Sequence, residues 1–459
     1  MIDTLPDNVL LEIFQFYKDD PTSFRTYTWC WITLVHVCRR WRQTIFGSPR
    51  CLNLRLVCSE RTPARRSLDI WPPLPIFLSS NIDQAVDEEC SENVIAALEC
   101  RQRTSFICIF DNIGSTLEKS IATMLGPFPV LTQCSLISTN NSVSMPVLPE
   151  TFLGGSAPRL ERFTLRGIPF PTFPNFVLAS TQIQHLSLEN IPHSGYISPD
   201  VMVTALASLP NLSRLSIGFQ SPLSRPVEIA PPPLTRAVFP ALIGLYFRGV
   251  SEYFEDFIAR IDGPHLFFLT ITFFMDLIFD IPRLYKFINR TFAERAWVNR
   301  AIMEFTGQEI NISFASIQQG IQCERLDWKL SSMTQILSQQ LPLLSPVEYF
   351  EIREPQLPSG DGRIGWEDHP DMDPSQWLEL FRLLIAVQTL YVSERLVHRV
   401  AAALTGEMAM EVLPALRSLR LEGLRPSGPV QDAIKSFATT RQLNNNPVVI
   451  QLWERQFMP

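Results

Sequence analysis

The stretch that decides the fold is Ile197–Phe219, ISPDVMVTALASLPNLSRLSIGF. Ser198, Pro199 and Asp200 combine an N-cap residue, a proline at the first helical position and an acid in the first turn, which predicts a helix up to about Leu209. Pro210 then ends the helix, and the alternating apolar residues after it predict a short strand. The stretch therefore predicts one helix followed by one strand.

Its last part belongs to a phrase that recurs along the chain, Pro-x-Leu-x-x-Φ-x-Φ, where Φ is apolar. Copies begin at residues 129, 158, 210, 240, 264 and 414, and copies without the proline begin at 181, 345 and 385. Pro232 and Pro342 also satisfy the rule, although out of register. From 129 to 264 successive copies start 23 to 30 residues apart, which is the period of a solenoid. The long interval between 264 and 345 predicts units around 290–340 whose phrase has drifted.

The phrase and its period resemble the leucine-rich repeat, L-x-x-L-x-L at 20 to 29 residues. The resemblance implies an α/β fold built as an irregular solenoid, an open arc with a parallel sheet on its concave face and helices on its convex face. Further helices are expected from Ser251, as an N-cap, to about Ile261, and from near Ser375. The pattern's usual asparagine or cysteine after the strand is replaced by Ile168, Ile191, Val250 and Leu424.

The N-terminal residues follow a different pattern. LPDNVLLEIFQFY (5–17) places Pro6 at the first position of a helix, and an apolar stripe with helical period follows it. A second block, WITLVHVCRRWRQTIFGSP (31–49), sets apolar residues beside a cationic face. So short a segment cannot bury all of these apolar side chains by itself.

Together these two blocks resemble the F-box, which docks substrate receptors onto the Skp-type adaptor of cullin–RING ubiquitin ligases. The resemblance implies a docking module at 1–50, a repeat region for target recognition at 51–459, and docking helices that contain Leu5, Pro6, Leu10, Ile13, Phe14, Val37, Cys38 and Trp41. The chain departs from the pattern in the long connection Lys18–Cys30 and in Leu52-Asn53, where a tryptophan is common. The whole layout is similar to large fungal families of F-box-like proteins with degenerate repeats.

Composition narrows the possible classes. A 459-residue chain with 46% apolar residues can bury a large core, and a net charge of −7 argues against a nucleic-acid surface. Leu266–Met275 is too short to cross a bilayer and predicts a buried strand instead. The nine cysteines contain no C-x-x-C pair, so we expect no zinc site and mostly buried, reduced thiols in the cytoplasm or nucleus.

Catalytic and cofactor motifs are missing from the sequence. The six histidines lack metal-ligand spacing, and no G-x-S-x-G, P-loop or G-x-G-x-x-G occurs. Glu255 and Asp256 are expected on a solvated helix face. We therefore expect no cofactor, no metal and no enzyme activity, with an unrecognised hydrolase as a remote alternative.

The resemblance implies a substrate-recognition subunit of a Skp–cullin–F-box ligase that binds the adaptor. From the charge and the length of the apolar runs we expect it to bind no nucleic acid and no membrane. An unknown target protein would contact outward strand positions, through residues such as Arg162, Gln184 and Arg214. It would also contact an acid-rich loop at 354–374 that contains Trp366, for which the alternative is a disordered surface loop. The alternative is a repeat scaffold with a vestigial F-box and no ligase role.

Overall fold

The computed structural model describes the chain except for residues 1–4, 19–29, 50–51, 53, 62–63, 83–87, 112–114, 140–145, 224–234, 275–281, 293–299, 306–308, 316–318, 325–346, 354–373, 406–410, 424–427 and 454–459. The chain divides into two compact units. The first contains residues 1–197 and 204–212, and the second contains 198–203 and 213–459. The predicted boundary near residue 50 stays a prediction, as does the open arc.

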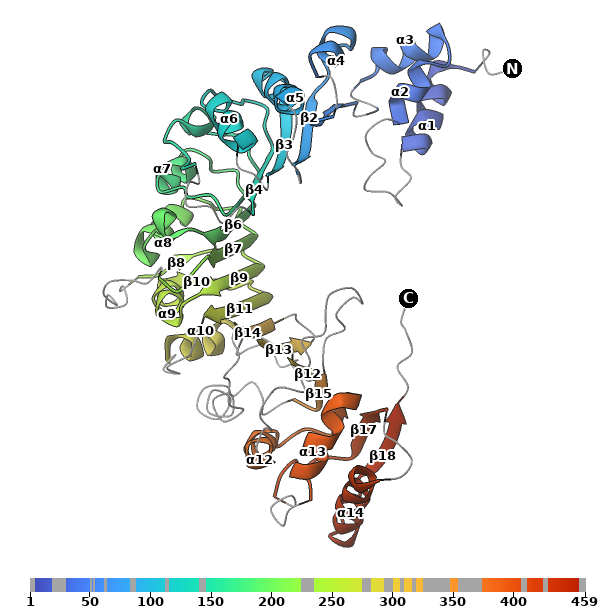
Figure 1. Cartoon of the computed structure of the whole chain (residues 1–459), viewed down its shortest axis with the longest axis vertical. Helices are drawn as coiled ribbons and strands as arrows, with labels where there is room; N and C mark the ends of the chain where they lie inside the picture. Colours follow the sequence, from blue (N-terminus) through green and yellow to red (C-terminus); the bar gives the residue numbers. More distant parts are fainter. Residues whose placement is uncertain are drawn as a thin grey trace. The chain divides into compact units, whose positions relative to one another are not determined.

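Three short helices begin the first unit: α1 (Asp7–Lys18), α2 (Cys30–Val35) and α3 (Arg39–Gly47) (Figure 1). Helix α1 starts at Asp7 rather than at Pro6, whose carbonyl accepts the Leu10 amide at 3.1 Å. Cys38 lies in the turn before α3 and caps it, because its Sγ accepts the Trp41 amide at 3.5 Å. We call these three helices the N-terminal module.

An aromatic cluster joins the N-terminal module to the rest of the first unit. The ring of Trp31 lies 5.2 Å from Trp71 and 5.9 Å from Phe46, in edge-to-face geometry. The Trp31 indole also donates to the Arg55 carbonyl at 3.0 Å. Edge-to-face aromatic pairs add about 0.5–1.5 kcal/mol each beyond their buried area, so the cluster fixes the module against the first strands.

The remainder of the first unit is a parallel sheet with helices along one side (Figure 1). Each strand pairs with the next one in the sequence. The strands are β1 (Leu56–Cys58), β2 (Ile76–Ile82), β3 (Thr104–Asp111), β4 (Gln133–Ser138), β5 (Arg162–Arg166) and β6 (His185–Ile191). The helices are α4 (Ala64–Ile70), α5 (Glu88–Glu99), α6 (Ser115–Thr123) and α7 (Phe173–Leu178), with short 3₁₀ turns at Phe152–Gly155 and His193–Gly195. Helix α8 (Pro199–Leu206) lies where the two units divide the chain.

The second unit repeats this plan. Its parallel strands are β7 (Arg214–Phe219), β9 (Gly244–Gly249), β11 (Phe268–Phe274), β15 (Tyr349–Arg353), β16 (Thr389–Val392), β17 (Ser418–Glu422) and β18 (Val449–Trp453). Its helices are α9 (Ser251–Ala259), α10 (Pro282–Phe292), α12 (Pro374–Leu383), α13 (Val397–Ala403) and α14 (Pro429–Leu443), with a 3₁₀ turn at Glu394–Leu396. Strands β8 (Ala237–Val238) and β10 (Ile261–Asp262) form a separate parallel pair. The predicted α/β class, with a parallel sheet and helices, is confirmed.

The phrase found in the sequence marks these strands closely. In all nine numbered copies the strand begins at the fifth residue, for example at Arg162, Arg214 and Ser418. The third, sixth and eighth residues are at most 5% exposed in every copy, as with Leu160, Phe163 and Leu165. The apolar positions of the phrase therefore form the core beneath the helices. The Pro232 and Pro342 copies begin outside the described residues.

Hydrogen bonds explain why proline suits the first position. In each of the six proline copies the amide of the third residue donates to the carbonyl before the proline, as Leu160 does to Ala157 at 3.0 Å. The proline thus occupies the second position of a β-turn, where its fixed φ is favourable. The fourth residue's carbonyl then accepts two amides of the next copy, as Glu161 does from Gln184 and His185. This shared acceptor sets the register between neighbouring strands.

The prediction of drifted repeat units around 290–340 is wrong for residues 300–324, while residues 293–299 and 325–340 lie outside the described residues. Strands β12 (Arg300–Phe305), β13 (Glu309–Ala315) and β14 (Gln319–Glu324) form an antiparallel meander between β11 and β15. Only residues 306–308 and 316–318 separate these strands, whereas a parallel crossover needs about a dozen residues or more. The outer strands of the meander still run parallel to β11 and β15.

Helix α9 corrects two further predictions. Ser251 is its first residue rather than its cap, since Val250 occupies the N-cap position. Glu255 and Asp256 are not solvated but 7% and 2% exposed. Glu255 accepts the amides of Arg283 and Leu284 at 2.8 and 2.7 Å and so caps α10. Asp256 pairs with Arg260 and Arg283, each at 3.2 Å.

Candidate interaction surfaces

The face of the first sheet that points away from its helices carries three rows of side chains. Strand alternation sends the phrase's apolar residues toward the helices and the intervening residues to this open face. Backbone register aligns the intervening residues across β2 to β6. The first row is Phe77, Phe106, Gln133, Arg162 and His185; the second is Ser79, Cys108, Ser135, Thr164 and Ser187; the third is Asn81, Phe110, Ile137, Arg166 and Glu189.

One end of the open face is aromatic. The rings of Phe77 and Phe106 stack with centroids 3.6 Å apart and planes 8° from parallel. Both rings are half-buried, as are Phe110 and Ile137 in the third row. These four residues, which we call the aromatic end, leave apolar area accessible to a partner.

The other end of the open face is charged. The side chain of Arg162 is exposed, and its guanidinium makes no hydrogen bond or ion pair with the residues that the structure describes. Arg166 lies 4.0 Å from Glu189, and the Ser187 hydroxyl donates to the same carboxylate at 2.8 Å. The Arg166 charge is thus partly balanced within the face, whereas that of Arg162 is not.

The predicted target-contacting residues fall at different places. Arg162 and Gln184 are exposed in the first unit, and Arg214 is exposed at the start of β7 in the second unit. Trp366 and most of the predicted loop at 354–374 lie outside the described residues. Sequence reasoning missed Phe77 and Phe106, because β2 and β3 lack the repeated phrase; the alternating run IFLSSNI was the available signal.

The predicted adaptor-docking residues differ in how far the structure exposes them. Leu10 and Phe14 are 0% and 1% exposed, and Phe14 packs edge-to-face on the half-buried Trp41 at 4.8 Å. Ile13 and Val37 are 44% and 59% exposed, and Pro6 is also exposed. Leu5 and Cys38 are half-buried. The buried group stabilises the N-terminal module, and the exposed group is free to contact another molecule.

Polar contacts hold the module's helices in this arrangement. The Arg40 guanidinium lies 2.8 Å from the Asp7 carboxylate and also donates to the Leu5 carbonyl. Arg42 donates to the Val35 carbonyl at 3.0 Å, which satisfies an acceptor at the end of α2. The basic residues of the second sequence block therefore tie its helix to α1 and α2.

Six cysteines whose side chains the structure describes are free thiols. Cys58 and Cys134 are buried, whereas Cys38, Cys90, Cys100 and Cys108 are half-buried. Burial raises the pKa of the Cys58 thiol to about 11, with smaller contributions from Cys100, which raises it, and Arg103, which lowers it. Burial also raises the pKa of Cys108 and of Cys134. These three thiols are therefore neutral near pH 7 and poor nucleophiles.

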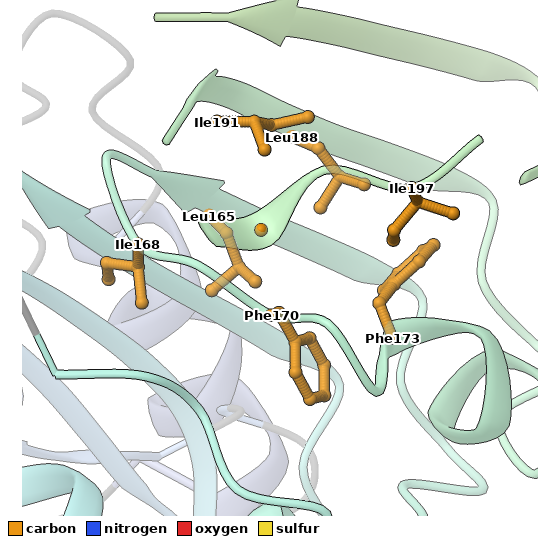
Figure 2. A pocket seen from close by; sticks show the side chains of 8 residues that line it. Leu165, Ile168, Phe170, Phe173, Leu188, Ile191 and Ile197 are labelled. Atoms are coloured by element: carbon orange, nitrogen blue, oxygen red, sulfur yellow. The ribbon is translucent and has the colours of Figure 1, made fainter. Parts of the chain in front are cut away.

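A small pocket lies where β5 and β6 enter their following loops (Figure 2). Figure 2 shows side chains converging on it from both strands and loops, and they carry carbon atoms only. The lining residues are Leu165, Ile168, Phe170, Phe173, Leu188, Ile191, Gly195 and Ile197. Such a lining can hold an apolar group but offers no acid, base or nucleophile.

Two other features bear on the sequence predictions. Within the described residues, no three His, Cys, Asp or Glu side chains gather in a way that could hold a metal ion. Among the helices of the described part, none has the length and apolar character to cross a membrane.

Comparison with known proteins places this chain in no family. No protein-family description matches it, and no curated protein matches it. Among solved structures, it is similar to the leucine-rich repeat-containing protein LegL7 from Legionella pneumophila, at 15% identity and a TM-score of 0.31. That match covers 75% of this chain and 99% of LegL7.

Proposed function

We propose that this chain is a protein-recognition subunit of the F-box type: its N-terminal module binds a Skp-type adaptor, and its repeat region holds a target protein. It would carry no catalytic group of its own. Ubiquitin transfer by other subunits would then depend on proximity, because holding two proteins in one assembly raises their effective concentration.

The observation that carries the proposal is the exposure of Ile13 and Val37. Both belong to the motif that resembles the F-box, and both leave apolar surface in solvent, whereas Leu10, Phe14 and Val35 of the same module are buried. Single exposed apolar residues are common on protein surfaces, so the position of these two within the motif is what supports a docking role. The aromatic cluster around Trp31 would hold a bound adaptor at a fixed place relative to the first strands.

The open face of the first sheet supports the recognition role. It combines half-buried aromatic rings with exposed polar and charged groups, the mixture found where proteins bind one another. Its backbone groups are already paired within the sheet, so a partner would be recognised through side chains.

Co-purification with a recombinant Skp-type adaptor tests the docking role. The variant Ile13→Asp/Val37→Asp should lose adaptor binding by tenfold or more, since it places two charges in an apolar contact. Leu178→Asp is the matched control, because Leu178 is 56% exposed at the end of α7, outside the module. Both variants should keep the circular dichroism spectrum of the wild type.

The second candidate is a repeat scaffold that assembles proteins without a ligase role. It is favoured by the same open face, which does not depend on the N-terminal module. Two results would favour this scaffold over the ligase role. One is unchanged adaptor retention by Ile13→Asp/Val37→Asp, and the other is no adaptor retention by the wild type.

A further inference from the structure

We infer that the first row of the open face binds a peptide segment that carries an apolar side chain and a carboxylate about 10 Å apart. The inference rests on the proposed recognition role and gives the chemistry of the partner. It concerns only residues of the first unit.

The row offers three kinds of contact in a fixed order. Phe77 and Phe106 provide a stacked aromatic platform, Gln133 provides an amide, and Arg162 provides a guanidinium. Neither the side-chain amide of Gln133 nor the guanidinium of Arg162 forms a hydrogen bond with the residues that the structure describes. Both groups therefore remain able to bind a partner.

The spacing follows from the sheet. Phe106 and Arg162 lie on β3 and β5, which are separated by β4 alone. Adjacent strands are about 4.8 Å apart, so the backbone positions that carry the Phe106 ring and the Arg162 guanidinium are about 10 Å apart. A segment crossing the strands would place an apolar side chain on the rings, a peptide group against Gln133, and an acid on Arg162.

Charge favours a carboxylate on the partner. The open face has two exposed arginines and one glutamate in the rows on β5 and β6, and the glutamate lies beside Arg166. Arg162 thus remains a single unbalanced cation, which matches a singly charged carboxylate. A doubly charged phosphoryl group would call for a second cation of equal strength, and Glu189, 4.0 Å away, partly balances the charge of Arg166.

The aromatic platform favours an apolar neighbour for that acid. The two rings are half-buried and already stacked, so a side chain laid on their outer side would bury further apolar area without moving them. Rigid aromatic anchors lose little side-chain entropy on binding. The partner's acid would then supply specificity and its apolar residue most of the affinity.

The test uses the full chain and a random dodecapeptide library displayed on phage. Enriched peptides should contain Asp or Glu together with a Leu, Met, Phe or Trp. A synthetic copy of an enriched peptide should bind Arg162→Glu at least tenfold more weakly than the wild type in fluorescence anisotropy. Arg159→Glu, the same charge change at an exposed residue in the turn before β5, should bind like the wild type.

A charge swap completes the test. Replacing the peptide's acid by Lys should restore binding to Arg162→Glu and weaken binding to the wild type. Equal affinity of Arg162→Glu and wild type, enrichment of basic peptides, or a library without any Arg162-dependent binder would overturn the inference. Adaptor co-purification with Arg162→Glu should be unchanged, so a failure here is distinguishable from a failure of the docking role.

Discussion

The two units share one repeat phrase but differ in how regularly their strands succeed one another. In the first unit six parallel strands succeed one another in sequence order. In the second, the antiparallel meander β12–β14 interrupts the series between β11 and β15. The difference teaches that connection length, rather than strand composition, decides strand direction, because three-residue loops allow only antiparallel neighbours.

The cores of the units differ as well. Under β5 the first unit packs aromatic rings: Phe163 lies 5.3 Å from Phe176 and 6.3 Å from Phe152. In the second unit, just before the meander, helices α9 and α10 are joined through buried carboxylates, Glu255 and Asp256. Helix α9 also packs aromatic rings, with Phe254 4.6 Å from Phe247, so these carboxylates add directional contacts to its apolar packing.

The largest expected effect is at the aromatic core of the first unit. Phe163→Ala should lower the free energy of unfolding by about 3–5 kcal/mol, because it leaves a cavity among rings that are fully buried. Phe106→Ala, at the aromatic end of the open face, should cost only about 1 kcal/mol, mostly the lost ring pair. Urea unfolding followed by tryptophan fluorescence measures both. Similar losses for the two variants would contradict the placement of Phe163 on the helix-covered face of the sheet and of Phe106 on its open face.

The polar junction of the second unit should be nearly as sensitive. Asp256→Ala should cost about 3 kcal/mol, since it leaves Arg260 and Arg283 without their buried carboxylate, whose side chain is 3% exposed. The control is Asp262→Ala, which breaks the surface pair with Arg290 and should cost at most about 1 kcal/mol. Hydrogen exchange of the α9 and α10 amides reports the effect locally. Equal protection in both variants would show that the buried pairs do not fix α10.

Much of this fold could be predicted from the sequence, and the parts that could not have physical causes. The phrase located nine strands because the burial of its three apolar positions is decided within eight residues, and six of the copies also have a proline in the preceding turn. The meander was missed because its strands lack the repeated phrase, although Gly307 between two alternating runs was a hairpin signal. The burial of Asp256 was missed because it depends on Arg283 from the next helix.

The candidate sites were predictable to a similar degree. Arg162 was found because outward positions follow from the phrase, whereas Phe77 and Phe106 lie on strands that lack it. Periodicity grouped Leu10, Ile13 and Phe14 on one stripe but could not say which side chain the other helices cover. That distinction depends on the packing of α2 and α3, with Trp41 against Phe14.

A matched pair of glycines gives the smallest effect and compares the units directly. Gly167 follows β5 at φ +71° and Gly423 ends the turn after β17 at φ +64°, so alanine is strained at both positions. The added Cβ would lie 2.4 Å from the Ser138 backbone carbonyl oxygen at Gly167, but against the Glu394 side chain at Gly423. A side chain can swing away and a paired strand cannot. Gly167→Ala should therefore cost about 2 kcal/mol and Gly423→Ala about 1 kcal/mol in urea unfolding. The reverse order would mean that the β4–β5 backbone yields more easily than the parallel ladder implies.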